Sequence, residues 1–111
     1  MEINNINEYQ ELSKRTMPAS DDKGKANYAL GLVSEAGEVG DIIKKEIFHG
    51  HPQDRDAVKN ELGDVFHYAA GLATMYGLTL QEILEGNVDK LRRRFPSGFN
   101  TVDSIKRVDT L

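Results

Sequence analysis

The chain has 111 residues, no cysteine and a formal net charge of −4 at pH 7, so it fits one domain with one modest core and cannot form disulfides or a cysteine-ligated zinc site. The acidic balance argues against nucleic acid as a partner, because duplex binding depends on many Lys or Arg contacts to phosphates. Since there is no apolar run of roughly 18 residues and no basic and apolar leader, we expect a cytoplasmic protein without a membrane partner.

Hydrophobic periodicity, capping residues and helix breakers predict four helices. They span residues 5–17, 23–49, 54–76 and 79–95. Pro18 and Pro96 end the first and the fourth, because proline cannot continue a helix. Gly77 stands just past the third helix, and Thr79 with Glu82 predicts a capping box at the start of the fourth.

Short connections make successive helices antiparallel neighbours, so we expect an all-α, antiparallel four-helix bundle-like domain without strands. One domain covers residues 1–111, with its core at residues 5–96 and a short, polar C-terminal tail at residues 97–111 that holds one short helical turn. The third helix is apolar nearly all round, and a chain of this length cannot cover every face by itself. We therefore expect an oligomer.

Two pairs of carboxylates lie on faces of their helices that should avoid solvent. Each residue advances about 100° around a helix, which places Glu35 within the apolar arc of the second helix and Glu38 at its margin. In the third helix, Glu61 lies near the centre of the apolar arc and Asp64 lies one turn along. Both pairs are therefore expected to point inward.

Buried carboxylates need compensation, because each costs several kcal/mol without a partner. Residues at i and i+3 stand roughly 5–6 Å apart at Cβ, and two such pairs on packed antiparallel helices form an all-oxygen cage that selects Mg²⁺ or Mn²⁺. One Glu-x-x-Glu pair alone is usually a solvated face with partners such as Lys45 or Lys59. Two pairs on successive helices favour metal binding.

The fourth helix also carries polar groups on its core-facing stripe. Asn87, Lys90 and Arg94 recur at i, i+3 and i+7 on the side of Leu91. Two cations beside a carboxylate metal site suit polyphosphate oxygens, and Asn87 offers a donor and an acceptor to a base or sugar. The alternative is that Lys90 and Arg94 extend from the edge of the stripe to solvent or pair with the acids.

Two glycines and one histidine accompany the acids. Gly37 and Gly63 each lie between the members of a pair, and the stability that glycine costs a helix suggests either a close backbone approach or tolerated drift. His67 lies on the Asp64 side of the third helix. There we expect a structural hydrogen bond rather than catalysis.

These motifs resemble those of the MazG-like all-α nucleotide pyrophosphohydrolases. The family signature is Glu-x-x-Glu, a variable spacer and Glu-x-x-Asp; here it reads residues 35–38, 22 intervening residues and residues 61–64. The flanking stretches at residues 32–39 and 60–65 are typical of the family, and residues 87–99 resemble its last helix and the following turn. The resemblance covers residues 23–99.

The resemblance implies Mg²⁺-dependent cleavage of a nucleoside triphosphate to the monophosphate and pyrophosphate, in a homodimer or a homotetramer built from dimers. The implied metal ligands, for Mg²⁺ or Mn²⁺, are Glu35, Glu38, Glu61 and Asp64. Glu61 is expected to be essential for turnover, and Glu38, at the margin of its stripe, is our choice to accept the proton of the attacking water. The residues expected to bind substrate are Lys45, Asn87, Lys90 and Arg94.

Other functions remain open at this point. The acids could form ion pairs in a non-catalytic helical assembly module, or a bundle could store or sense metal without cleaving triphosphates. Within the same superfamily, a dUTP- or dCTP-specific hydrolase and a phosphoribosyl-ATP pyrophosphohydrolase are alternatives. Neither the base specificity nor the biological role, such as housecleaning of nucleotide pools, can be read from these residues.

Overall fold

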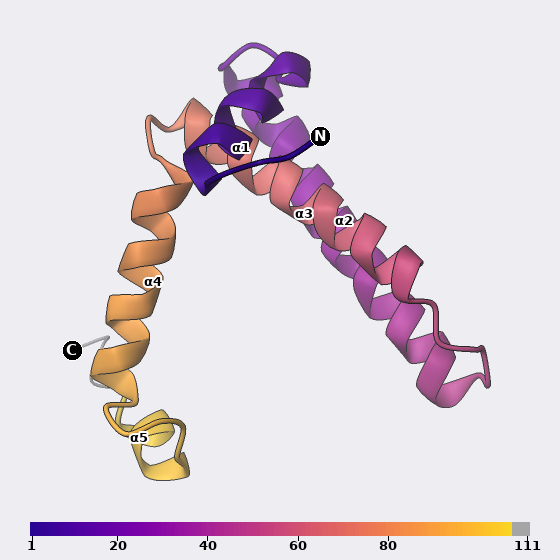
Figure 1. The fold of residues 1–111 in the computed structure, drawn as a ribbon, viewed down its shortest axis with the longest axis vertical. Helices are drawn as coiled ribbons and strands as arrows, with labels where there is room; N and C mark the ends of the chain where they lie inside the picture. Colours follow the sequence, from indigo (N-terminus) through magenta and orange to yellow (C-terminus); the bar gives the residue numbers. More distant parts are fainter. Residues whose placement is uncertain (108–111) are drawn as a thin grey trace.

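The computed structural model describes residues 1–107 and consists of helices joined by short turns (Figure 1). The elements are α1 (Ile6–Ser13), the 3-10 turn η1 (Lys14–Thr16), α2 (Asp22–Phe48), α3 (Arg55–Met75), α4 (Leu80–Arg94) and α5 (Thr101–Lys106). Within the described residues there is no strand, only an isolated bridge between Pro96 and Gly98. The predicted all-α class is therefore confirmed. Residues 108–111 of the predicted tail lie outside the described part.

The helices begin where the sequence places a capping side chain. In each case a side-chain oxygen accepts a hydrogen bond from the backbone amide three residues on, which satisfies one of the free donors of the first turn. The caps of the first four α-helices are Asn5, Asp21, Asp54 and Thr79. The predicted capping box is confirmed, because the Glu82 carboxylate also accepts a hydrogen bond of 2.9 Å from the Thr79 amide.

Helices α2 and α3 form a long antiparallel hairpin, and most of the tertiary contacts of the chain lie between them (Figure 1). Aromatic rings fill the space between the two helices at the end near α1. The ring of Tyr28 meets that of Tyr68 edge-on, with 4.9 Å between centroids, and Tyr28 is buried. The hairpin therefore has a well-packed end, from which both helices run outward.

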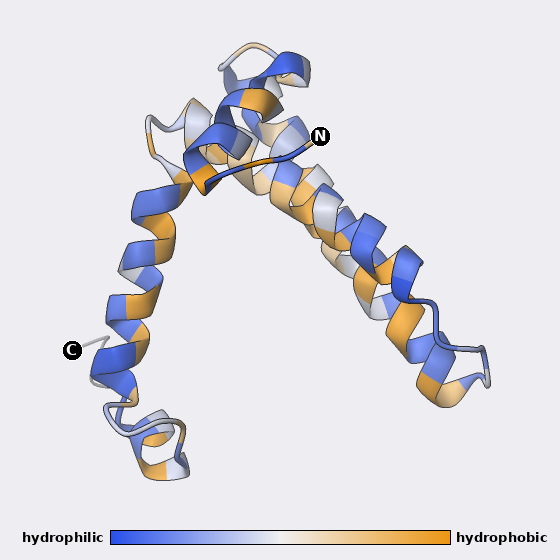
Figure 2. Cartoon of the chain, in the orientation of Figure 1, coloured by the Kyte–Doolittle hydropathy of each residue, from blue (hydrophilic) through white to orange (hydrophobic). Residues whose placement is uncertain are grey.

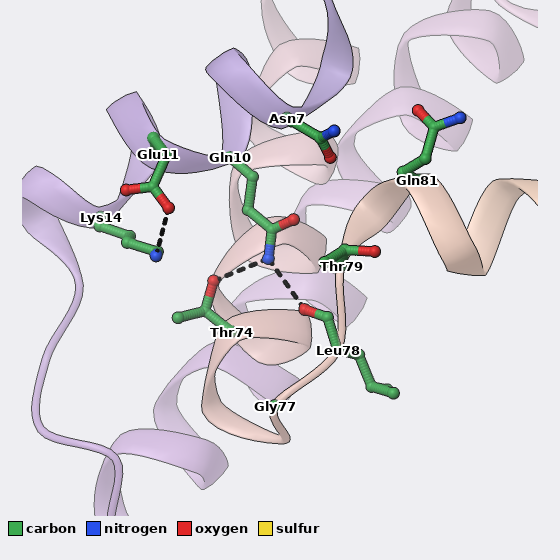
Figure 3. Close-up of a pocket in the computed structure, with 9 residues that line it drawn as sticks. All are labelled: Asn7, Gln10, Glu11, Lys14, Thr74, Gly77, Leu78, Thr79 and Gln81. Atoms are coloured by element: carbon green, nitrogen blue, oxygen red, sulfur yellow. Dashed lines mark hydrogen bonds and ion pairs between the residues drawn. The ribbon is translucent and has the colours of Figure 1, made fainter.

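Helix α1 closes the packed end through one buried amide, Gln10 (Figure 3). Its Nε2 group donates to Thr74 Oγ1 at 2.9 Å and to the Leu78 carbonyl at 3.0 Å. Its Oε1 atom accepts from the Leu80 amide at 2.7 Å, the first residue of α4. Since one side chain contacts the end of α3, the turn and the start of α4, Gln10 ties the direction of α4 to α1.

Helix α4 leaves the hairpin at this junction and does not return to it. In Figure 1 the α2–α3 hairpin and α4 form the two arms of an open V, with α1 at its apex. Within the described residues, the main contacts of α4 are those with α1 at the junction and with the short α5. The predicted antiparallel four-helix bundle is thus not confirmed, because the fourth helix does not lie along the second or third.

The open shape leaves the chain with a small core. Its radius of gyration is 16.9 Å, whereas a compact domain of this length has about 13 Å. Its accessible surface is 8114 Å², whereas about 6100 Å² is expected for a compact monomer of 12.4 kDa. The central cluster consists of Ala70, Ala73 and Leu80, with Ile6 and Tyr9 packed against it.

Apolar side chains that this core does not bury lie along all three long helices. Figure 2 shows hydrophobic residues recurring along α4 between hydrophilic ones, as on one side of an amphipathic helix. The stripe includes Leu84, Val88 and Leu91, each at least 40% exposed. Among the described residues, no helix is both long and apolar enough to cross a membrane.

Candidate metal centre

Three of the four predicted acids come together between α2 and α3. Carboxylate oxygens of Glu35, Glu61 and Asp64 all lie within 4.8 Å of one another, and each of the three residues is half-buried. Glu61 and Asp64 share a face because they are three residues apart on α3. Glu35 reaches them from the opposite helix, so the hairpin brings together acids that lie 26 or more positions apart in sequence.

The charges of these acids are poorly compensated by the protein. A hydrogen bond with Glu61, desolvation, and then the negative charges of Glu61, Asp64 and Glu38 raise the pKa of Glu35 to about 7. A carboxyl group takes up a proton in this way when no positive charge is close enough to stabilise its ionised form. A divalent cation among the three oxygens would supply that charge, and hard oxygen donors are the ligands that Mg²⁺ and Mn²⁺ prefer.

Glu38 stands apart from the other three. It is exposed, one turn beyond Glu35 on α2, and its carboxylate is not among the clustered oxygens. Its charge nevertheless contributes to the raised pKa of Glu35. The Glu38 carboxylate is therefore near enough to Glu35 for its charge to act on it, but it is not part of the cluster.

Aromatic side chains line the cluster on the side of α1. Burial and the negative charge of Asp64 raise the pKa of the Tyr9 hydroxyl, which places α1 beside α3 at this point. One turn past Asp64, His67 Nε2 lies 3.1 Å from the Tyr28 hydroxyl. The structural hydrogen bond expected for His67 is thereby confirmed.

Of the four predicted substrate-binding residues, Lys45 lies on the hairpin with the acids, where Asp41 and then Glu38 raise its pKa, and the other three lie on α4. Lys45 forms an ion pair of 2.8 Å with Asp41, four residues earlier on the same face of α2. The sequence analysis did not single out Asp41. Asn87 and Lys90 are exposed on α4, the arm that diverges from the hairpin. Arg94, at the end of α4, lies 5.8 Å from the centroid of the Phe95 ring.

The two glycines of the acidic motifs do not mark a close backbone approach inside the chain. A Cβ atom added to Gly37 or Gly63 would meet nothing within 4 Å, so within one chain the structure favours tolerated drift, the second of the two expected explanations. Tight contacts between the two helices lie instead at Gly31 and Gly71, where an added Cβ would collide with Tyr68 and Tyr28; at Gly24 an added Cβ would collide with the backbone of Ala19. Periodicity places both glycines on the face of the acids, one turn or two away, but it does not show that they meet the opposite helix.

The fold and this cluster define an all-helical protein with an oxygen-donor site between two antiparallel helices. The family model of the MazG nucleotide pyrophosphohydrolase domain matches residues 23–99, which contain all of α2 but its first residue, together with α3 and α4. Since the match covers more than half of the sequence, the chain belongs to this family, and the resemblance found from the motifs is confirmed.

Two curated relatives are similar to this chain. Gene 37 protein of Mycobacterium phage L5 is 34% identical over 80 residues, which cover 68% of this chain and 70% of that protein. Uncharacterized protein YvdC of Bacillus subtilis (strain 168) is 32% identical over 73 residues, which cover 58% of this chain and 69% of that protein. No solved structure matches the chain.

Proposed function

We propose that this protein hydrolyses nucleoside or deoxynucleoside triphosphates to the monophosphate and pyrophosphate. The observation that carries the proposal is the convergence of Glu35, Glu61 and Asp64 within 4.8 Å, in a chain of the MazG nucleotide pyrophosphohydrolase domain family. The crowding of these acids supports a cation-binding role over an ion-paired structural one, because the pKa of Glu35 is raised by a hydrogen bond with Glu61, by desolvation and by neighbouring negative charges, not lowered by a cationic partner.

Magnesium is the proposed cofactor, with manganese as a substitute. Glu35, Glu61 and Asp64 would hold it, and we propose Glu38, whose charge acts on Glu35, as a further ligand from the margin of the site. When bound, the metal would neutralise phosphate charge and acidify an attacking water. Because Glu38 is exposed and outside the cluster, it is the carboxylate left to accept the proton of that water.

The substrate would also need positive charge, which one chain does not place beside the acids. We assign pyrophosphate binding to Lys90 and Arg94, base or sugar contacts to Asn87, and an assisting role to Lys45 once it leaves Asp41. The first three lie along the edge of the apolar stripe of α4. We propose that a second copy of the chain covers this stripe, in a homodimer or a homotetramer built from dimers.

Charge complementarity supports this assembly. The end of α4 carries a run of basic residues, Lys90 and Arg92–Arg94, whereas the hairpin presents the acids. Docking the stripe of α4 on a second copy brings cations toward a carboxylate site, where they stabilise a bound polyphosphate. Self-association would also cover the large exposed apolar surface of the single chain.

A substrate panel tests the reaction. Purified protein is incubated with Mg²⁺ and each canonical nucleoside and deoxynucleoside triphosphate, together with dUTP and phosphoribosyl-ATP, and pyrophosphate and orthophosphate are measured separately. We expect pyrophosphate and the monophosphate in equal amounts. Release of orthophosphate alone contradicts the proposed reaction, and the absence of any product supports an assembly module instead.

The Glu61→Gln variant tests the site. Removing one carboxylate should lower kcat by at least about 100-fold, since loss of even an outer-shell partner of a metal costs 10–100-fold. Circular dichroism should show unchanged helix content. The control is Asp89→Asn, which removes one charge on the exposed face of α4. Full activity of Glu61→Gln would place the catalytic site elsewhere.

A further inference from the structure

Two tyrosines of the hairpin each lie against a glycine of the opposite helix. A Cβ atom added to Gly31 of α2 would overlap the ring of Tyr68 of α3, at 2.6 Å from Cζ and 2.7 Å from Cδ1. A Cβ atom added to Gly71 of α3 would overlap the ring of Tyr28 of α2 in the same way. At both positions the ring occupies the space that any other residue would need.

These contacts form the layer of the hairpin next to the clustered acids. Gly31 lies four residues before Glu35 on α2, and Tyr68 lies four residues after Asp64 on α3. Residues four apart share a helix face, and the two helices are antiparallel. The acids therefore lie one helical turn from the Gly31–Tyr68 contact on both helices, in the same direction. The spacing of the backbones at this contact therefore sets the spacing one turn away.

The tyrosine rings have little freedom to move aside. Tyr28 is buried, and its hydroxyl donates to the Thr16 carbonyl at 3.2 Å, so the contact with His67 Nε2 uses the hydroxyl oxygen as acceptor. The Tyr68 ring stands edge-on to Tyr28, and its centroid lies 5.3 Å from that of His67. A group inserted at Gly31 would thus push on a ring that is supported from two sides.

We infer that Gly31 and Tyr68 are positioning residues, which hold α2 and α3 at the separation that lets Glu35 meet Glu61 and Asp64 around one cation. The inference rests on the proposed metal binding. Metal ligands tolerate only about 0.2 Å of error, and Mg²⁺ demands nearly ideal octahedral geometry. A methyl group at Gly31 overlaps the Tyr68 ring, so either the ring or the helix that carries it must move, and we expect the helix to move because the ring is supported by Tyr28 and His67.

The test is a comparison of two glycine-to-alanine substitutions on α2. Gly31→Ala introduces the overlap with Tyr68, whereas Gly40→Ala meets nothing within 4 Å. Both remove a helical glycine, so both gain the same intrinsic helix propensity. Mn²⁺ binding is measured by the electron paramagnetic resonance signal of the free ion. We expect Gly31→Ala to weaken Mn²⁺ binding at least about 10-fold and Gly40→Ala to leave it within about twofold.

A second pair of variants separates positioning from folding. In the double variant Gly31→Ala with Tyr68→Leu, the smaller side chain makes room for the methyl group, so Mn²⁺ binding should recover most of the loss. If Gly31→Ala alone does not fold, Tyr68→Leu in the native background is compared with the wild type, and it should bind Mn²⁺ more weakly because the spacer is shortened. Helix content is followed by circular dichroism throughout.

The outcomes distinguish this inference from the proposed function. If the wild-type protein binds no Mn²⁺, the proposed metal site fails, and this inference fails with it. If the wild type binds Mn²⁺ and Gly31→Ala binds it equally well, the metal site stands and the positioning role of Gly31 is overturned. If Tyr68→Leu, with Gly31 intact, binds as the wild type does, the role of Tyr68 is overturned.

Discussion

Glu35 is the member of the acidic cluster whose ionised form the surrounding residues disfavour. A hydrogen bond with Glu61, desolvation, and the negative charges of Glu61, Asp64 and Glu38 raise the pKa of the Glu35 carboxyl to about 7. Groups that repel one another in this way lower the stability of the fold that gathers them. They also bind a cation most favourably, so stability and binding place opposite demands on the same side chain.

A Glu35→Gln substitution should separate these two demands. In EDTA we expect the variant to melt at a higher temperature than the wild type, because one like charge is removed and an amide can donate to Glu61. In saturating Mg²⁺ the order should reverse, since the wild type gains stability by binding and the variant has lost a ligand. Thermal unfolding followed by circular dichroism in both conditions measures the two shifts.

The control for this experiment is again Asp89→Asn, whose charge lies on the exposed face of α4. In EDTA and in Mg²⁺ alike, Asp89→Asn should change the melting temperature by no more than a typical surface substitution does. If Glu35→Gln is less stable than the wild type in EDTA, the acids are not in conflict, and a structural role as hydrogen-bonding partners would fit better than metal binding.

Residue-level patterns predicted the carboxylates better than the glycines, for a physical reason. Glu35 and Glu61 stand out because a charge on an apolar arc conflicts with helix periodicity, which one sequence displays. Whether Gly31 or Gly37 meets the opposite helix depends on the register between α2 and α3. Register is a property of the packed pair, so it became visible only in the structure.

At the scale of the element, the ends of α2, α3 and α4 were predicted to within one residue, because they are set locally. The first helix was predicted too long, since α1 ends at Ser13 and the chain continues as a 3-10 turn to Thr16. Thr79 and Glu82 cap α4 through hydrogen bonds to their own first turn. The direction of α4 is not local, since it depends on Gln10, which contacts the α3–α4 junction from about 70 positions away. Nothing in the periodicity of α4 indicates that contact. The sequence therefore predicted that α4 packs along the hairpin, whereas in the structure it diverges from it.

Gln10→Leu should destabilise this junction strongly. The leucine preserves the size of the side chain but leaves the Leu80 amide and the Leu78 carbonyl without their partner. The Leu80 amide is buried, and leaving it unpaired costs about 1–3 kcal/mol. The partly buried Leu78 carbonyl adds a smaller cost, so we expect a loss of about 2–4 kcal/mol in the free energy of unfolding. Urea unfolding followed by circular dichroism provides the measurement.

Gln81→Leu is the matched control, because Gln81 is an exposed glutamine whose side chain bonds only locally, to Glu85. It should change the free energy of unfolding by less than about 0.5 kcal/mol. Equal effects of the two substitutions would mean that Gln10 does not anchor α4 in solution and that the open arrangement has another cause.

At the scale of the whole molecule, the single chain exposes more surface than a compact protein of its mass. The excess over the expected value is about 2000 Å², more than the roughly 800 Å² that each partner buries in a standard interface and within the range of obligate dimers. The same surface carries the stripe of α4 and the predicted substrate residues beside it. One assembly step would therefore bury the apolar surface and complete the site.

The Val88→Asp substitution tests that step. Val88 lies in the stripe of α4 at 45% exposure, and a carboxylate there would have to be buried unpaired in the interface, at a cost of several kcal/mol. Light scattering coupled to size-exclusion chromatography should give two or four times 12.4 kDa for the wild type and the single-chain mass for Val88→Asp.

Because the α4 cations would then no longer reach the acids of a second copy, kcat/KM should fall together with assembly, while Mn²⁺ still binds at Glu35, Glu61 and Asp64. The neighbouring Asp89→Asn should assemble normally. A monomeric wild type with full activity would show instead that α4 folds back onto its own hairpin to complete the site.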